Sequence, residues 1–365
     1  MLEYRTFRNG DPPEILEVWK ASRDSRAFAA VRTCDALETL LFAKPYFDPS
    51  GFIVAVSDGR IVGFAHAGFG ATEDKRSIDY SLGAVYIVRV HPAFRNQGIG
   101  ANLLKLAQSY LSRHGALVQY LGGMFPLNAY YVGLYGGSEL PGLLESDASA
   151  RRFAAAHGYE PFDKCLVYQR KVEDLPRVAD TRIALLRRSV EVQAEPWPLP
   201  TTWWDAAVLG NMPSLRYEMI ERETQTPIGR AWVWEMEYFG QAWGFPTVGI
   251  TDFQIESAFR RRGYGKLLLL TMLKHLKEQQ IELVELQTMS TNDSAQGLYE
   301  GLGFMKVDSG QAYRLSRPLD LSNLPPLKES HPSTRPQTHH GFNRAGAVIP
   351  ITLNEPTQIE FTRPE

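Results

Sequence analysis

The chain carries the same pattern of sequence twice, and this duplication limits its possible folds more than any other feature. Residues 85–111 read VYIVRVHPAFRNQGIGANLLKLAQSYL, and residues 249–276 read GITDFQIESAFRRRGYGKLLLLTMLKHL. In both segments a β-branched and aromatic run precedes an Arg-x-x-Gly-x-Gly loop, and apolar residues three and four positions apart follow it. This order predicts a strand, a glycine-rich loop and a helix in each copy.

A second matched pair follows these segments in the same order. Residues 147–161 read DASARRFAAAHGYEP, and residues 292–306 read NDSAQGLYEGLGFMK. Both predict a short helix that ends at a glycine, Gly158 or Gly303, because glycine readily takes the left-handed conformation that closes a helix. Each helix is then expected to lead into a final strand. Two matched pairs in one order indicate a duplicated domain.

The patterning of the rest of the chain predicts the other elements. In the first copy we expect strands at 2–6, 52–57, 61–67, 85–90, 129–134 and 165–170, and helices from about 12, from about 35, at 98–113 and at 148–157. In the second copy we expect strands near 215–223, 228–237, 248–255, 283–289 and 311–315, and helices at 265–278 and 293–302.

These elements predict two domains, at 1–172 and 182–317. A charged linker at 173–181 is expected between them, and a polar, proline-rich tail at 318–365 after them, with a short apolar run at 347–353. The first copy has a Gly- and Tyr-rich insertion at 122–142. In the second copy a Trp- and Pro-rich segment at 196–212 stands in place of the two N-terminal helices.

Composition excludes several classes of protein. Lysine and arginine number 39 against 41 acidic residues, so the net charge of −2 favours neither nucleic acid nor a membrane as partner. Hydrophobic residues make up 44% of the chain, as in a core-forming protein. The only cysteines, Cys34 and Cys165, cannot form a disulfide framework or a Cys-rich zinc site. A charged N-terminus and the lack of a long apolar run predict a cytoplasmic location.

The loop from Arg260 to Lys266 has the chemistry of an anion site. Its two glycines let backbone N–H groups approach a ligand, and the following helix adds free N–H groups and the positive end of its dipole. Three arginines and Lys266 strengthen this site, which suits a diphosphate. The loop from Arg95 to Gly100 is the same kind of anion site with fewer charges, and Ala101 occupies the position that corresponds to Lys266. The alternative for either loop is an ordinary glycine turn that opens a helix.

Other phosphate and catalytic motifs are excluded by spacing. A dinucleotide-binding loop needs a third glycine where Leu103 and Leu268 stand, and a Walker loop needs Ser or Thr where Leu267 stands. The chain has no Gly-x-Ser-x-Gly elbow and no His-Glu-x-x-His, so neither serine hydrolysis nor a metal is expected.

The two motifs together resemble the GNAT superfamily of acetyl-CoA-dependent N-acetyltransferases, including tandem members such as the mycothiol synthases. The resemblance covers about 4–170 and, more fully, about 216–315. In the second copy the Asn-x-x-Ala-x-x-x-Tyr-x-x-x-Gly-Phe motif is complete, with Asn292, Ala295, Tyr299, Gly303 and Phe304. The resemblance implies an α/β (α+β) fold with two tandem acyl-CoA N-acyltransferase domains. Each would have a mixed, mainly antiparallel sheet flanked by helices, with its central strands splayed where acetyl-CoA enters.

The resemblance also implies the roles of individual residues. The cofactor-binding residues would be Phe253, Gln254, Ile255, Arg260, Arg261, Arg262, Gly263, Tyr264, Gly265, Lys266 and Asn292 in the second copy, and Val88, Arg89, Val90, Arg95, Asn96, Gln97, Gly98, Ile99, Gly100 and Ala101 in the first. Tyr299 matches the family's proton donor, for which a core aromatic residue is the alternative. Many relatives carry a glutamate base eleven residues before the lead arginine, where this chain has Gly249 and Ala84. Asp252 is the nearest candidate base, with a structural hydrogen bond as its alternative.

The first copy departs from the family pattern. Asp147 replaces the asparagine and Ala154 the tyrosine. A tyrosine of the insertion, Tyr130, Tyr131 or Tyr135, could replace the missing proton donor, although packing is the simpler explanation for all three. The catalytic domain is therefore expected to be the second.

The expected activity is transfer of an acetyl group from acetyl-CoA to an amine of a small molecule or peptide. One alternative is a non-enzymatic module that binds or senses acyl-CoA, and another is acyl transfer by the first domain. Two interpretations are open for the tryptophans at 197, 203, 204, 232, 234 and 243. They could line a hydrophobic pocket for the acceptor, or they could pack in the core, and the large size of their side chains favours the core.

Overall fold

The first half of the protein alternates strands and helices as the repeat predicts. We use a computed structural model, which describes residues 1–173, 175, 181–210 and 212–330. The elements of the first half are β1 (Leu2–Thr6), α1 (Pro12–Ala21), α2 (Cys34–Leu37), β2 (Phe52–Ser57), β3 (Arg60–Ala71), β4 (Ile78–Val90), α3 (Ile99–Arg113), β5 (Val118–Leu121), β6 (Leu143–Leu144), α4 (Ala148–Ala156) and β7 (Tyr159–Lys171).

The second half repeats the central part of this order. Its elements are α5 (Thr181–Ser189), β8 (Val190–Pro196), α6 (Trp203–Leu209), β9 (Ser214–Glu221), β10 (Pro227–Glu235), α7 (Glu237–Trp243), β11 (Thr247–Ile255), α8 (Tyr264–Glu278), β12 (Leu283–Met289), α9 (Asp293–Gly301) and β13 (Met305–Leu315), followed by β14 (Leu327–Lys328). β14 pairs with β1, and the Ser330 amide donates to Thr6 Oγ1 at 2.8 Å, so residues 327–330 lie along the first strand.

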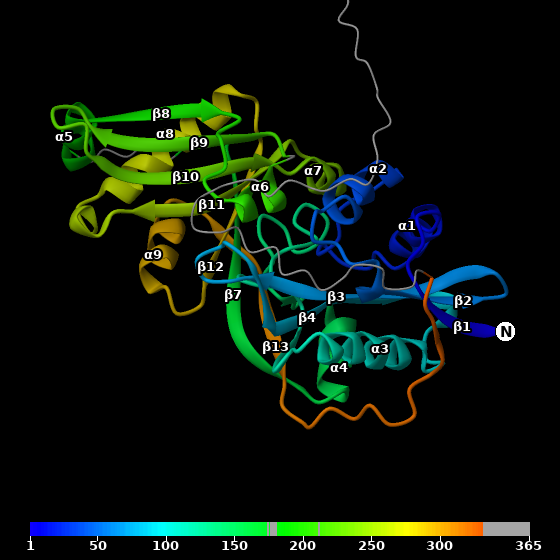
Figure 1. Ribbon diagram of the computed structural model, residues 1–365. Helices are drawn as coiled ribbons and strands as arrows, with labels where there is room; N and C mark the ends of the chain where they lie inside the picture. Colours follow the sequence, from blue (N-terminus) through cyan, green and yellow to red (C-terminus); the bar gives the residue numbers. More distant parts are fainter. Residues whose placement is uncertain (174, 176–180, 211, 331–365) are drawn as a thin grey trace, which may run out of the picture. The chain divides into compact units, whose positions relative to one another are not determined.

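All these strands belong to one mixed sheet (Figure 1). Their order is β14-β1-β2-β3-β4-β5-β13-β7-β12-β11-β10-β9-β8, with β6 paired to β13. Three pairs are parallel, β1–β14, β4–β5 and β11–β12, and the other pairs are antiparallel. The expected fold class, a mixed and mainly antiparallel sheet flanked by helices, is confirmed.

Side chains that alternate along the strands build a separate core on each face of the first half. Phe52 and Val54 of β2 pack with α1 and α2, whereas Ile53 and Ala55 pack with α3. Figure 1 shows the same arrangement, with α1 and α2 on one side of β1–β4 and α3 on the other. This period of two is the one that the sequence at 52–57 predicts.

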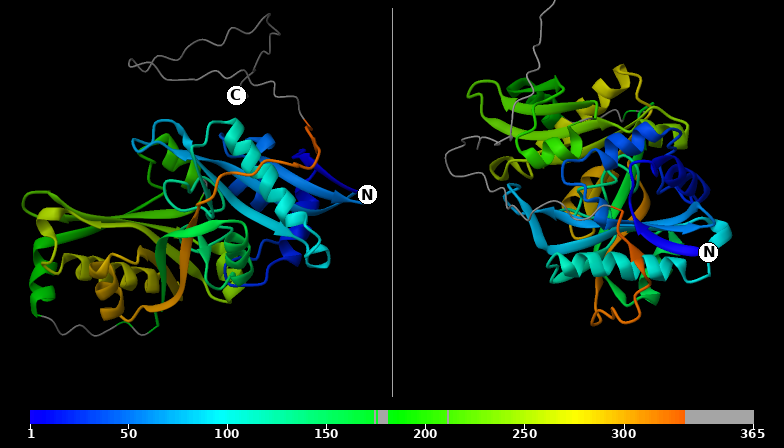
Figure 2. Two further views of the ribbon diagram at one scale, coloured as in Figure 1. Left: turned by 90° about the horizontal axis from the view of Figure 1, so that it is seen from below. Right: turned by 45° about the vertical axis from the view of Figure 1, so that its right-hand side comes forward.

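The two halves exchange their last strands. β7, which ends the first half, pairs with β12 of the second, and β13, which ends the second half, pairs with β5 of the first. β7 and β13 also pair with each other from Met305–Gln169 to Leu315–Tyr159, and they run side by side in green and orange (Figure 2). Both halves fall within one compact unit, Met1–Pro332.

The central strands separate in each half, as expected. β4 pairs with β5 only as far as Val85 and Leu121, and β11 pairs with β12 only as far as Ile250 and Leu286. Residues 86–90 and 251–255 continue beyond this point with one edge open. Gly98 and Gly263 then open α3 and α8, each after a short 3₁₀ turn that follows the strand.

Some expected elements were wrong. Residues 129–134 form turns and no strand, and their apolar character comes from burial, since Tyr130 and Leu134 are at most 2% exposed. The strand that was expected to follow the helix at 98–113 is instead β5, which comes directly after α3. The predicted elements also lack β8, whose apolar alternation is short and interrupted by charges, and α5, α6 and α7, of which α6 lies within the Trp-rich segment. The apolar run at 347–353 and residues 174 and 176–180 of the linker lie outside the described residues.

Candidate active site

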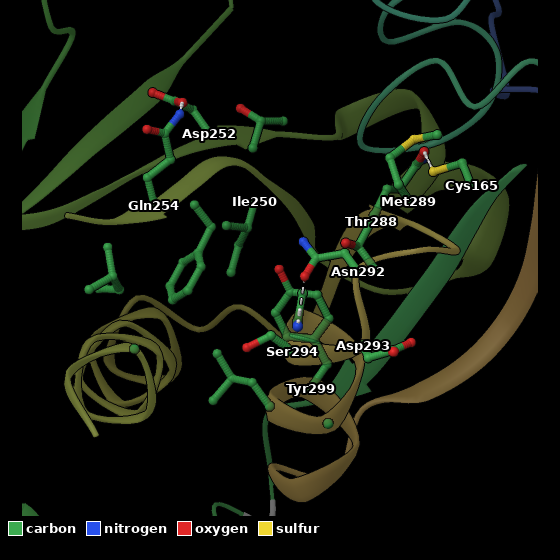
Figure 3. A pocket seen from close by; sticks show the side chains of 18 of the residues that line it. Cys165, Ile250, Asp252, Gln254, Thr288, Met289, Asn292, Asp293, Ser294 and Tyr299 are labelled. Atoms are coloured by element: carbon green, nitrogen blue, oxygen red, sulfur yellow. Dashed lines mark hydrogen bonds between the residues drawn. The ribbon is translucent and has the colours of Figure 1, made fainter. Parts of the chain in front are cut away.

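A cavity of about 1090 Å³ lies where β11 and β12 separate. β11 forms one wall and the N-terminal ends of α8 and α9 form others (Figure 3). Of the residues expected in this site, the lining includes Asp252, Phe253, Gln254, Ile255, Arg260, Arg261, Gly263, Gly265, Lys266, Asn292 and Tyr299. Arg262 and Tyr264 do not line the cavity. Tyr264 instead packs in the core of the second half, which leaves only its backbone for a ligand.

The loop before α8 is shaped by one arginine and one glycine. Arg260 Nε donates to the Ile255 carbonyl at 2.7 Å, which folds the loop back on the end of β11. Gly263 caps the helix with φ of 98°, a conformation that favours glycine. Arg261 Nη1 donates to Ser294 Oγ at 3.0 Å and so joins the loop to α9. Gly263, Gly265 and Lys266 at the start of α8 line the same cavity as Arg260 and Arg261. The free N–H groups of a helix N-terminus beside such cations suit a diphosphate.

A β-bulge interrupts the pairing of β11 with β10 beside this cavity. Arg230 lies opposite Gln254 and Trp232 opposite Thr251, so β11 has an extra residue between these pairs. Asp252, with φ of 48°, lies in the bulge. Its Oδ2 accepts from Arg230 Nε at 2.8 Å, and its Oδ1 accepts from Gln254 Nε2. The carboxylate thus makes the structural hydrogen bonds that were the alternative to a catalytic role.

Tyr299 stands on α9 with its ring beneath Asn292, and its phenolic oxygen is directed into the cavity (Figure 3). The residue is 4% exposed. Burial first, and then the nearby Glu139 carboxyl and Cys165 thiol, raise the pKa of Tyr299, so its phenol is protonated at neutral pH. A protonated phenol at this position can donate a proton to a leaving group.

The asparagine of the second motif is a helix cap. Asn292 Oδ1 accepts from the Ala295 amide at 3.2 Å, and Asp147 Oδ1 accepts from the Ala150 amide at 3.3 Å at the corresponding place in the first half. Both residue types suit the N-cap position, which explains part of the repeat without reference to a ligand.

The first half has a smaller cavity, about 340 Å³, at its own splayed strands. Its lining includes Val88, Arg89, Val90, Arg95, Asn96, Gly98, Gly100 and Ala101 of the expected residues. Gln97 does not line it, and Ile99 is buried in the core. The loop repeats the geometry of the other half, because Arg95 Nε donates to the Val90 carbonyl at 3.2 Å and Gly98 caps α3 with φ of 77°.

Three side chains form a buried polar network in this smaller cavity. Arg89 Nη2 and Asp147 Oδ2 are 2.7 Å apart, with side chains 6% and 1% exposed. Tyr135 OH donates to the same Asp147 oxygen at 3.3 Å, and the Arg89 guanidinium lies 3.8 Å from the centre of the Phe28 ring. The Tyr135 hydroxyl, which could replace the proton donor that the first half lacks, is therefore hydrogen-bonded to the Asp147 carboxylate.

The remaining aromatic candidates are packing residues. Tyr130 and Tyr131 surround the buried His66 together with Phe52 and Tyr86. None of the six tryptophans named above lines either cavity, and Trp204 and Trp234 are buried in the core that the two halves share.

Sequence reasoning missed several residues of the larger cavity. Glu139 and Met124 come from the insertion of the first half, Cys165 from β7, and Gln287 and Thr288 from β12. The insertion is visible in the sequence, where its tyrosines are the residues that suggest a role in proton transfer. The insertion contacts the second half only because the two halves exchange strands. No pattern in the sequence near Glu139 therefore predicts that it lies in this site.

No helix in the described residues is both long and apolar enough to cross a membrane. The described residues also contain no cluster of three or more His, Cys, Asp or Glu side chains that could hold a metal ion.

Several curated relatives of this chain are mycothiol acetyltransferases. A mycothiol acetyltransferase of Acidimicrobium ferrooxidans is 35% identical over 116 residues, which are 30% of this chain and 34% of the relative. A mycothiol acetyltransferase of Renibacterium salmoninarum is 26% identical over 61% of this chain and 65% of its own length. The chain thus spans about a third to just under two thirds of these relatives.

A solved structure with two GNAT domains in tandem is similar to this one. A tandem GNAT protein from the clavulanic acid biosynthesis pathway has a TM-score of 0.63 at 17% identity, over 88% of this chain and 100% of that one. The model of the acetyltransferase (GNAT) family matches residues 16–136 and again residues 183–304. These two matches cover more than half of the chain, so this protein belongs to the GNAT family of acetyltransferases, with two tandem matches to the family model.

Proposed function

We propose that this protein is an acetyl-CoA-dependent N-acetyltransferase and that its second half is the catalytic one. The observation that carries this proposal is the larger cavity, which joins a cationic loop, an open strand edge and the buried phenol of Tyr299. In the first half the corresponding cavity is smaller, and Arg89 and Asp147 form a buried ion pair within it.

Each part of the larger cavity has a function in acetyl transfer. Arg260, Arg261 and Lys266, with the first turn of α8, would hold the diphosphate of acetyl-CoA. The bound thioester supplies an electrophilic carbonyl and a thiol leaving group. The open edge of β11 at 251–255 supplies backbone N–H groups that can stabilise the oxyanion of the tetrahedral intermediate. Tyr299 donates its phenolic proton to the departing sulfur.

The acceptor is proposed to be a primary amine of a small molecule. Relatives of this chain are named mycothiol acetyltransferases, and this name supports an acceptor that is chemically related to mycothiol. Four carboxylates, Glu139, Asp163, Asp252 and Asp293, line the same cavity as the cationic loop, and they favour a positively charged acceptor.

A screen of primary amines with purified protein tests this function. Acetyl-CoA is supplied with each amine, thiol release is followed, and the products are identified by mass spectrometry. We expect acetylation of at least one small polar amine by the wild type and loss of turnover in Tyr299→Phe. Tight binding of acetyl-CoA with no turnover of any amine would favour a binding or sensing module instead.

A further inference from the structure

Glu139 belongs to the insertion of the first half but lines the larger cavity of the second. The same cavity contains Tyr299, Cys165 and Asp252. The charge of Glu139 contributes, after burial, to the raised pKa values of both the Tyr299 phenol and the Cys165 thiol. Glu139 is therefore close to the proposed proton donor although the two belong to different halves of the protein.

The second half holds the backbone around Glu139 in place. The Ser138 amide donates to Glu285 Oε1 at 2.7 Å, and Trp234 Nε1 donates to the Ser138 carbonyl at 3.0 Å. Gln287 Nε2 donates to the Glu139 carbonyl at 3.1 Å. Bonds from β10 and β12 thus fix residues 138 and 139 on both sides, and the position of the Glu139 side chain is preorganised.

Gly249 makes room for this arrangement. A Cβ atom at Gly249 would lie 2.7 Å from Cβ of Ser138, so a side chain there would displace the insertion. Gly249 is the β11 position at which the sequence resemblance leads one to expect a glutamate. In this protein the space beside that position is filled by the segment that carries Glu139.

The carboxylate of Glu139 is unpaired. Across the described residues it has no hydrogen bond and no ion pair, in contrast to Asp252, which Arg230 and Gln254 hold. Burial, and less strongly the negative charge of Asp252, raises the pKa of Glu139 to about 7. The titratable groups that line the same cavity are Asp163 and Cys165 on β7, Asp252 on β11, Arg260 and Arg261 in the loop before α8, Lys266 on α8, and Asp293 and Tyr299 on α9. Glu285 on β12, which accepts from the Ser138 amide, is paired with Arg26.

We propose that Glu139 of the first half is the general base for the acetyl transfer in the second half. This inference rests on the proposed function. The Glu139 carboxylate takes a proton from the ammonium group of the acceptor, and the neutral amine attacks the thioester carbonyl carbon. As the C–S bond breaks, Tyr299 gives its proton to the sulfur. The second proton of the attacking nitrogen restores the Tyr299 phenol, and Glu139 releases its proton to solvent.

The test uses two isosteric amines that differ in protonation. Propylamine is protonated at pH 7, whereas O-ethylhydroxylamine is neutral and needs no base for its first deprotonation. For Glu139→Gln we expect kcat/KM with propylamine to fall about 100-fold or more, and kcat/KM with O-ethylhydroxylamine to fall less than about fivefold. The wild-type rate with propylamine should rise and level off above about pH 7, where Glu139 is ionised. The variant should show no levelling there, because its rate follows the fraction of neutral amine in solution, which keeps rising toward the pKa of the amine itself. Glu160→Gln, an exposed carboxylate of β7 outside the cavity, is the matched control.

The outcomes separate this inference from the proposed function. Equal losses with both amines would show that Glu139 is only structural. Selective loss in Asp252→Asn with an unchanged Glu139→Gln would assign the base to Asp252. If the wild type acetylates neither amine nor any amine of the screen, the proposed function fails and the role of Glu139 falls with it. Should Glu139→Gln not fold, Glu139→Asp, which keeps the carboxylate but shortens its reach, is expected to lose activity with propylamine alone.

Discussion

The hydroxyl group of Tyr299 can be removed with little change in packing. Its ring packs against Tyr168, Phe253 and Phe304, and Tyr299→Phe keeps these contacts. We expect kcat to fall about 10²–10⁴-fold, because only the proton donor is lost, while acetyl-CoA affinity measured by calorimetry stays close to that of the wild type. Tyr168→Phe is the control, since its hydroxyl donates to Glu300 outside the cavity. Full turnover in Tyr299→Phe would show that another group protonates the thiol.

Glu139 also has an expected effect on stability that changes with pH. Because the folded-state pKa is raised to about 7 from 4.5, the folded protein disfavours the ionised carboxylate. This cost is absent below about pH 4.5, grows as pH rises and is complete above about pH 7. Glu139→Gln should therefore unfold with a free energy higher by about 1–3 kcal/mol at pH 8, and by less at pH 5, in urea titrations. A variant less stable than wild type at pH 8 would contradict an unpaired carboxylate.

At the scale of elements, α3 and α8 should bind acetyl-CoA unequally at their N-termini. The loop before α8 and the first turn of α8 carry four cations, three of which line the cavity, whereas the loop before α3 has Arg95 alone, which also pairs with Asp24 at 3.3 Å. If two extra charges reach the phosphates, each adding about 0.5–1 kcal/mol, the dissociation constants differ roughly fivefold to thirtyfold.

Calorimetric titration of two glycine variants checks this difference. Gly98→Trp and Gly263→Trp each place a bulky side chain at a helix cap with positive φ, so each should remove one site. We expect the tighter site to be lost in Gly263→Trp. If the protein binds acetyl-CoA at a single site and only Gly98→Trp abolishes that binding, the first half and not the second would be the catalytic one.

The elements that sequence predicted well are those with local signals. The loops at Gly98 and Gly263 and the helices after them follow from glycine position and apolar period alone. The turns at 129–134 resembled a strand because their side chains are apolar, and only tertiary packing distinguishes the two. Glu139 could not be placed for a related reason. Its position depends on hydrogen bonds to β10 and β12, which are far away in the sequence.

At the scale of the whole molecule, the exchanged strands make each half depend on the other. Without the second half, β7 would lose its partners β12 and β13, and β5 would lose β13. The core around Phe28 and Leu37 would also lose Trp204, Trp234 and Phe239, which the second half supplies. Unpaired strand edges and an exposed core both disfavour an isolated half.

We therefore expect neither residues 1–173 nor residues 181–365 to fold when produced alone. Produced together, the two fragments should associate into one species, because β7 and β13 pair along most of their length and each also pairs with the other half. Differential scanning calorimetry and size-exclusion chromatography check this expectation. The separate fragments should show no cooperative transition, and the mixture should show a single one. A fragment 1–173 that melts cooperatively by itself would mean that the exchanged strands contribute little to stability.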